Sequence, residues 1–157
     1  MTDKSVRKGI YILPNLFTTG ALFAGFSAII QATNDRFELA AVLIFVAMVL
    51  DGLDGRVARL TNTTSEFGVE YDSLSDMISF GLAPALVVYE WALYSMGKLG
   101  WLVAFVYVAA AALRLARFNT HASLDKRCFQ GLPSPSAAAL LASFIWVIND
   151  YGFPSTD

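Results

Sequence analysis

Four aspartates form two pairs between positions 51 and 76, and each pair has the spacing of a helical turn. Asp51 and Asp54 are three residues apart, and Asp72 and Asp76 are four apart, so each pair lies on one face of its helix. If the two helices form a hairpin, the four carboxylates meet around one point, where they repel one another and lose hydration. Mg²⁺ or Mn²⁺ relieves both costs, because hard cations prefer oxygen ligands, and no cysteine or histidine is placed to favour zinc.

Two metal ions in such a cluster suit phosphoryl-group chemistry, in which they neutralise charge on the attacked and leaving groups. Small residues leave the neighbouring helix faces bare, at Gly52, Gly55, Ala58 and Gly68. A nucleotide can therefore lie against backbone there, and Arg56 and Arg59 can offer guanidinium groups to phosphate oxygens. Small residues are also typical of packing between membrane helices, and basic residues at helix ends often only set topology. The aspartates are harder to explain by packing, because acids within membrane segments are usually functional.

The elements that position these residues are membrane helices. Hydrophobic residues make up 56% of the 157 residues, charged residues make up 15%, and the mean hydropathy is +0.55. These values are typical of an integral membrane protein. Five apolar stretches predict an all-α, polytopic transmembrane helical bundle: Gly9–Gln31, Leu39–Leu53, Met77–Met96, Leu99–Leu113 and Ala137–Ile148. Several are shorter than the roughly 20 residues that a span requires, so we expect the helices to continue into polar turns.

The basic residues indicate the orientation of these spans. Nine of the eleven fall on one side: Lys4, Arg7, Lys8, Arg56, Arg59, Arg114, Arg117, Lys126 and Arg127. The positive-inside rule then predicts a multi-pass cell-membrane protein with its N-terminus and its aspartates in the cytoplasm and its C-terminus outside. The net charge of -2 argues against a nucleic-acid partner. We expect the loop Thr61–Glu66 to reverse the chain between the two aspartate helices, with Thr64 or Ser65 as the cap of the second.

The segment Asp51–Asp76 resembles the signature of the CDP-alcohol phosphotransferases, D-x-x-D-G-x-x-A-R followed, after eight residues, by G-x-x-x-D-x-x-x-D. Within that family, "LRLARFNT" at Leu113–Thr120 and "FQGLPSPSAA" at Phe129–Ala138 resemble the membrane phosphatidylserine synthases. "LPNLFTTG" near the start is similar to them too. The resemblance implies an enzyme that transfers the phosphatidyl group of CDP-diacylglycerol to the hydroxyl of L-serine and releases CMP.

The resemblance also implies roles for individual residues. It implies two Mg²⁺ or Mn²⁺ ions held by Asp51, Asp54, Asp72 and Asp76. Asp76 would also be the general base that takes the proton of the serine hydroxyl. The implied CDP-lipid site contains Asp54, Gly55, Ala58, Arg59 and Gly68, and we add Asn15 at the entrance of the first helix.

A bidentate arginine is the natural partner of the serine carboxylate, and Arg114 and Arg117 lie three residues apart beside Asn119. We therefore predict these three residues as the serine site, although basic residues at the end of a span can also serve as topology anchors. For Ser134, between two prolines, a turn is as good an explanation as a ligand role.

Members of the family usually have six or more spans, and relatives form homodimers. Residues 1–157 are therefore interpreted as a single, C-terminally incomplete transmembrane domain. Other acceptors remain open, because the same motif serves enzymes that make phosphatidylglycerophosphate or phosphatidylinositol phosphate. A membrane metal-ion carrier also explains the acids, though not the small residues. A structural scaffold predicts that aspartate-to-asparagine changes are silent.

Overall fold

The protein consists of helices and short turns, without strands, in the residues that the computed structural model describes, 12–121 and 132–151. Its long helices are α2 (Ile12–Ala32), α3 (Phe37–Leu60), the continuous helix Glu66–Met96, α6 (Lys98–His121) and α7 (Ser134–Asp150). The predicted all-α bundle of five helices is confirmed. Some residues used above lie outside the described ranges: Lys4, Arg7, Lys8, Lys126, Arg127 and residues 129–131.

Within the described ranges, three helices are long and apolar enough to cross a membrane, namely Pro14–Ala32, Glu66–Met96 and Lys98–Thr120. The other two long helices do not meet this description. α3 carries charged residues near both ends, and α7 is only 17 residues long. The helices after α2 all extend beyond their apolar stretches, as expected where outer turns face protein or lipid headgroups. Together with the composition, these spans identify an integral membrane protein.

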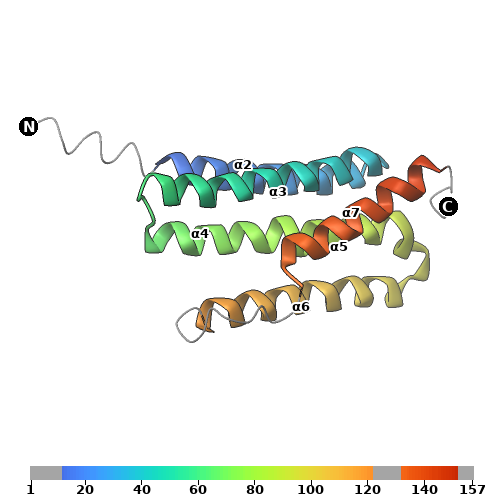
Figure 1. Ribbon diagram of the computed structural model, residues 1–157. Helices are drawn as coiled ribbons and strands as arrows, with labels where there is room; N and C mark the ends of the chain where they lie inside the picture. Colours follow the sequence, from blue (N-terminus) through green and yellow to red (C-terminus); the bar gives the residue numbers. More distant parts are fainter. Residues whose placement is uncertain (1–11, 122–131, 152–157) are drawn as a thin grey trace, which may run out of the picture.

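Small residues bring α2 and α3 together along their length, and Figure 1 shows the two helices side by side above the Glu66–Met96 helix. The buried alanines are Ala21, Ala24, Ala28 and Ala32 of α2 and Ala40, Ala41 and Ala47 of α3. Their methyl groups allow the two backbones to approach closely, which is how helices associate in lipid. This packing sets the position of α3, which carries Asp51 and Asp54.

The helix with the second aspartate pair begins at a side-chain cap. The chain reverses after α3, and Ser65 Oγ accepts a hydrogen bond from the Gly68 N–H at 3.0 Å before α4 (Glu66–Asp76). This is the predicted hairpin with one of the two predicted caps. After Asp76 the helix widens into the π-helical segment η1 (Met77–Leu82) and returns to α-helical geometry in α5 (Ala83–Val88). It ends in η2 (Tyr89–Leu93), again π-helical, and the 3-10 turn η3 (Tyr94–Met96).

Serine hydroxyls attach this long helix to α2. Ser75 Oγ donates to the Thr18 carbonyl at 3.2 Å, and Ser79 Oγ donates to the Ala21 carbonyl at 3.1 Å. The contact is so close at Gly25 that an added Cβ would lie 2.8 Å from Ser79 Cα. Only glycine fits at that position, and the turn that carries Asp76 is thereby held against α2.

The last two helices close the bundle in different ways. In Figure 1, α7 lies obliquely across α3 and α5, and its Ala138, Ala142 and Ile145 are buried in the core. α6 contacts η1, α5 and η2 along one side. Its other side exposes large apolar side chains: Leu99, Trp101, Leu102, Val103, Phe105 and Val106. In a bilayer such a face meets acyl chains at no cost.

Candidate metal and substrate site

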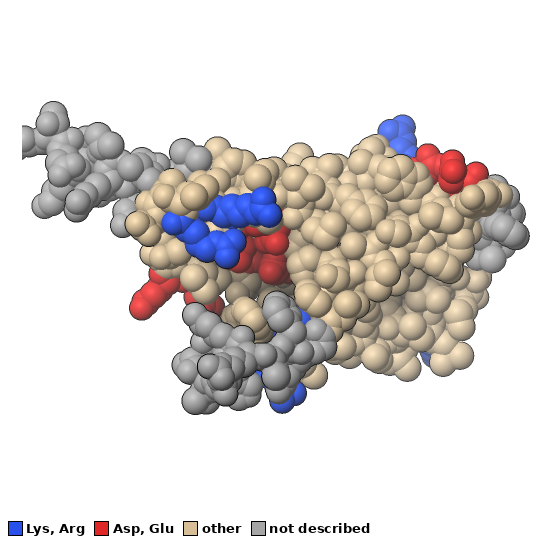
Figure 2. All heavy atoms as spheres, viewed as in Figure 1, with Lys and Arg blue, Asp and Glu red and all other residues tan. Residues whose placement is uncertain are grey.

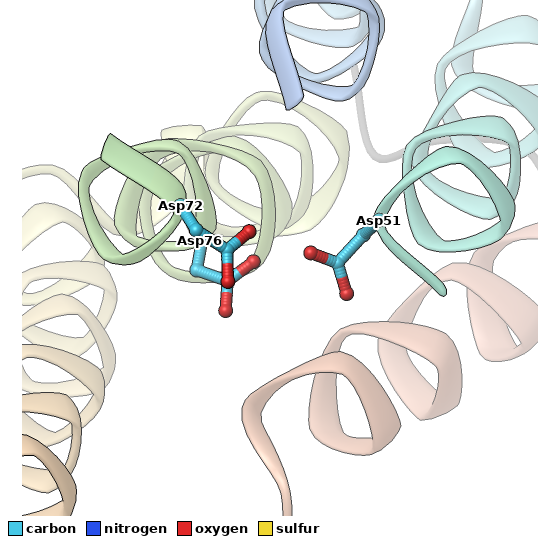
Figure 3. A group of neighbouring side chains, drawn as sticks. All are labelled: Asp51, Asp72 and Asp76. Atoms are coloured by element: carbon cyan, nitrogen blue, oxygen red, sulfur yellow. The ribbon is translucent and has the colours of Figure 1, made fainter. Parts of the chain in front are cut away.

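Asp51, Asp72 and Asp76 come together where α3 and α4 face each other. Figure 3 shows Asp72 and Asp76 extending from one helix toward Asp51 on the other. Each offers a carboxylate oxygen, and these three oxygens lie within 4.8 Å of one another. All three side chains are half-buried, so the group is reachable from outside the bundle but only partly hydrated.

Asp54 flanks this group and does not belong to it. Residues three apart in an α-helix differ by about 60° around the axis, and the Asp54 side chain faces α2, where Thr18 Oγ1 donates to its Oδ2 at 2.6 Å. Asp54 is 4% exposed and remains next to Asp72, which neighbours both Asp51 and Asp54. Among the described residues, three of the four predicted carboxylates thus form one compact group, and Asp54 lies beside that group at Asp72.

Thr18 is a site residue that sequence reasoning does not single out. Its hydroxyl contacts Asp54 on α3, and its carbonyl accepts the Ser75 hydroxyl from α4. The side chain is 3% exposed, and Oγ1 also lies 3.1 Å from the Pro14 carbonyl oxygen. Thr18 thus connects α2 to both aspartate helices. The only signal in the sequence is a hydroxyl within an apolar run, one turn after Pro14.

We expect Thr18→Val to weaken Mn²⁺ binding about 10-fold, because a partner that orients a metal-binding carboxylate is typically worth that much. Valine has nearly the shape of threonine and cannot donate to Asp54. Titration of the purified protein with Mn²⁺, followed by electron paramagnetic resonance, measures the change. Thr18→Ser is the matched control because it keeps the hydroxyl, and it should bind as the wild type does. Equal losses in both variants would instead assign the effect to altered packing at this position, because serine keeps the hydroxyl that valine lacks.

A cavity of about 300 Å³ lies directly beside the carboxylates, within the size range of small-molecule sites. The residues assigned above to the CDP-lipid site all line this cavity: Asn15, Asp54, Gly55, Ala58, Arg59 and Gly68. Thr18 and Asp72 line it as well. Asp72 is therefore shared by the cavity and by the group of three carboxylates.

Two glycines keep the backbone of this cavity accessible. Arg59 Nε donates to the Gly55 carbonyl at 2.9 Å, which holds the guanidinium group along the rim. At Gly68, an added Cβ would lie 3.1 Å from Ser65 Oγ and 3.6 Å from Asn15 Oδ1, so any side chain would fill the space between them. The cavity thus combines bare backbone with one cationic side chain, which suits a phosphate-bearing ligand.

The donor set fits a hard divalent cation. Asp72 Oδ1 is buried and has no hydrogen-bond partner among the described residues. The charges that act on Asp76 are those of Asp51, Asp72 and Asp54, all negative. A buried, unpaired acceptor amid like charges is costly, and a cation with oxygen ligands supplies the missing partner. Because every donor is a carboxylate oxygen, Mg²⁺ or Mn²⁺ is favoured over zinc.

The residues predicted for serine do not line the cavity. Arg114 Nη1 donates to Ser134 Oγ at 3.1 Å, which joins α6 to the first turn of α7. Arg114 Nε is buried and has no partner in the described part of the chain. Asn119 Nδ2 donates to Ser73 Oγ at 3.0 Å, and Ser73 directly follows Asp72. Arg117 is exposed.

Basic side chains lie beside the carboxylates on the molecular surface. Figure 2 shows basic atoms next to acidic atoms toward the end of the molecule where α3 and α4 are joined. On α3 the basic residues of this region are Arg56 and Arg59, and both are exposed. Positive charge next to the aspartates can attract an anionic ligand to this part of the surface.

The family model described as CDP-alcohol phosphatidyltransferase matches residues 11–156 of this chain. The chain is also similar to proteins named CDP-diacylglycerol–serine O-phosphatidyltransferase. It is 46% identical over 145 residues to that of Helicobacter pylori (strain ATCC 700392 / 26695), covering 92% of this chain and 61% of the relative. Identity to the Mycobacterium bovis protein (strain ATCC BAA-935 / AF2122/97) is 37%, covering 93% of this chain and 54% of the relative.

The similarity extends to Bacillus subtilis (strain 168), whose protein of the same name is 35% identical over 87% of this chain and 77% of its own length. The chain spans 61% of the Helicobacter pylori relative and 54% of the Mycobacterium bovis relative. The matched region contains both aspartate pairs and the residues that line the cavity.

Proposed function

This chain belongs to the CDP-alcohol phosphatidyltransferase family, and on that premise we propose that it carries the site of a phosphatidylserine synthase. The reaction transfers the phosphatidyl group of CDP-diacylglycerol to the hydroxyl of L-serine and releases CMP. The observation that carries this proposal is the position of Asp72, which belongs both to the carboxylate group and to the cavity. The names of the relatives support serine as the acceptor.

In this proposal the cavity binds the CDP headgroup, while the acyl chains extend into the bilayer. Gly55, Ala58 and Gly68 leave room for the nucleotide, and the Arg59 guanidinium on the rim pairs with a phosphate oxygen. Asp51, Asp54, Asp72 and Asp76 would hold the two Mg²⁺ or Mn²⁺ ions. When bound, these ions neutralise the pyrophosphate and stabilise the charge that develops on the leaving CMP.

Asp76 is proposed as the general base. It takes the proton of the serine hydroxyl, whose oxygen attacks the lipid-side phosphorus while the bond from that phosphorus to CMP breaks. A serine hydroxyl is a poor nucleophile at neutral pH, so a carboxylate at the site of attack is required. Asp76 is the last residue of α4, directly before the widened turn η1, and it does not line the cavity.

Arg114 is proposed to bind the carboxylate of the acceptor. Its Nη1 is engaged by Ser134, while its buried Nε is unpaired among the described residues. The side of the guanidinium group that carries Nε can therefore bind both oxygens of one carboxylate. Asn119, held by Ser73 beside Asp72, and the exposed Arg117 complete the proposed serine site. In the membrane we propose a cytoplasmic site and a homodimeric enzyme.

The test is release of CMP from CDP-diacylglycerol in detergent micelles with Mn²⁺ or Mg²⁺, with and without L-serine. We expect release that depends on both serine and metal, and phosphatidylserine as the lipid product. Release with glycerol-3-phosphate or an inositol phosphate in place of serine would assign another acceptor in the family. Transport of Mn²⁺ into sealed vesicles, without CDP-lipid turnover, would instead favour the metal carrier.

A further inference from the structure

The π-helical segment η1 begins directly after Asp76 and receives a hydrogen bond from another helix. Tyr107 of α6 donates its hydroxyl to the Phe80 carbonyl at 3.1 Å. We infer that Tyr107 is a positioning residue for the aspartate group and acts on it through η1. This inference rests on the proposed metal site, but not on the identity of the acceptor alcohol.

Pro84 disturbs the backbone hydrogen bonds of the helix near Phe80. In an unbroken α-helix, the carbonyl of residue 80 accepts the N–H of residue 84, and proline has no N–H. Phe80 is fully buried, and the interior of a bilayer holds no water that could bind its carbonyl. The Tyr107 hydroxyl supplies a donor at this carbonyl, so the widened turn is stabilised by a side chain of α6.

Hydrogen bonds hold η1 and the end of α4 from two sides. On one side the Ser75 and Ser79 hydroxyls bind carbonyls of α2, and on the other side Tyr107 binds Phe80. Asp76 lies between Ser75 and η1, so a rotation of this turn changes the distance from its carboxylate to Asp51 on α3. π-helical turns are frequent at functional sites, where one extra residue redirects a side chain. Tyr107 is thus placed to keep Asp76 in register with Asp51 and Asp72.

Tyr107→Phe tests the inference, because it keeps the ring and removes only the hydroxyl. We expect the apparent Mn²⁺ affinity, measured by electron paramagnetic resonance, to fall about 10-fold, as for other groups that support metal ligands. The rate of CMP release should fall by a similar factor, while KM for CDP-diacylglycerol changes little, because Tyr107 lies outside the cavity lining. Tyr94→Phe is the matched control. It lies in η3, at the end of the Glu66–Met96 helix that contains η1, and it should change neither the Mn²⁺ affinity nor the rate.

Amide hydrogen exchange of the peptide that covers residues 77–82 provides a second measurement that needs neither metal nor turnover. Faster exchange together with weaker Mn²⁺ binding supports the inference. Faster exchange with unchanged Mn²⁺ binding overturns it, because the hydroxyl then only stabilises the helix. Unchanged exchange together with unchanged Mn²⁺ binding also overturns it. If the wild-type protein binds Mn²⁺ but releases no CMP with any acceptor, the proposed reaction fails while the effect of Tyr107 on Mn²⁺ is still decided.

Discussion

Replacement of Asp76 by asparagine is expected to lower serine-dependent CMP release by about 10²- to 10⁴-fold, which is the usual contribution of a general base. The amide oxygen can still act as a neutral ligand, but it cannot take the proton of the serine hydroxyl. The expected loss is therefore in kcat, with a much smaller change in KM for CDP-diacylglycerol. Single-turnover release of CMP from bound CDP-lipid measures the chemical step directly.

The matched control for Asp76→Asn is Glu70→Gln on the same helix. Glu70 is exposed and stands outside both the carboxylate group and the cavity lining, so its neutralisation should leave the rate nearly unchanged. Mn²⁺ titration of both variants separates loss of the base from loss of the metal. A normal rate in Asp76→Asn would contradict the proposed role and would favour another group as proton acceptor.

The meeting of Asp51 with Asp72 and Asp76 follows from sequence because only local rules are involved. Helical spacing puts each pair on one face, and the short, capped loop before α4 forces the chain to reverse. The same rules do not show which neighbour Asp54 contacts, because the turn of about 60° between residues three apart matters once a third helix is present. α2 supplies Thr18 on that side, and no spacing rule shows which helix will pack there.

The cavity could be anticipated for a similar reason. Gly55, Ala58, Arg59 and Gly68 lie within one hairpin, so their proximity needs little knowledge of the tertiary structure. The contacts of Arg114 with Ser134 and of Tyr107 with Phe80 join residues 20 and 27 positions apart on different helices. Their geometry depends on how α6 packs against α7 and η1. Pro84 within the apolar run Met77–Met96 does indicate a disturbed helix, but it does not show which side chain donates a hydrogen bond to it.

Replacement of Arg114 by lysine is expected to raise KM for L-serine roughly 30-fold, which corresponds to about 2 kcal/mol of lost binding. Lysine keeps the charge, but it offers a single point donor where the guanidinium group offers two parallel N–H groups to the carboxylate. KM for CDP-diacylglycerol should stay close to the wild-type value, because Arg114 does not line the cavity. Steady-state kinetics with each substrate varied in turn separates the two effects.

The matched control for Arg114→Lys is Arg36→Lys, which makes the same change at an exposed position before α3, on the side opposite the aspartates. It should leave both KM values unchanged. Serine ethyl ester, which lacks the carboxylate charge, adds a second criterion: it should be a poor acceptor for the wild type and should lose little more in Arg114→Lys. Equal sensitivity of serine and its ester to the substitution would mean that Arg114 stabilises the packing of α6 against α7 through Ser134 and does not bind the acceptor.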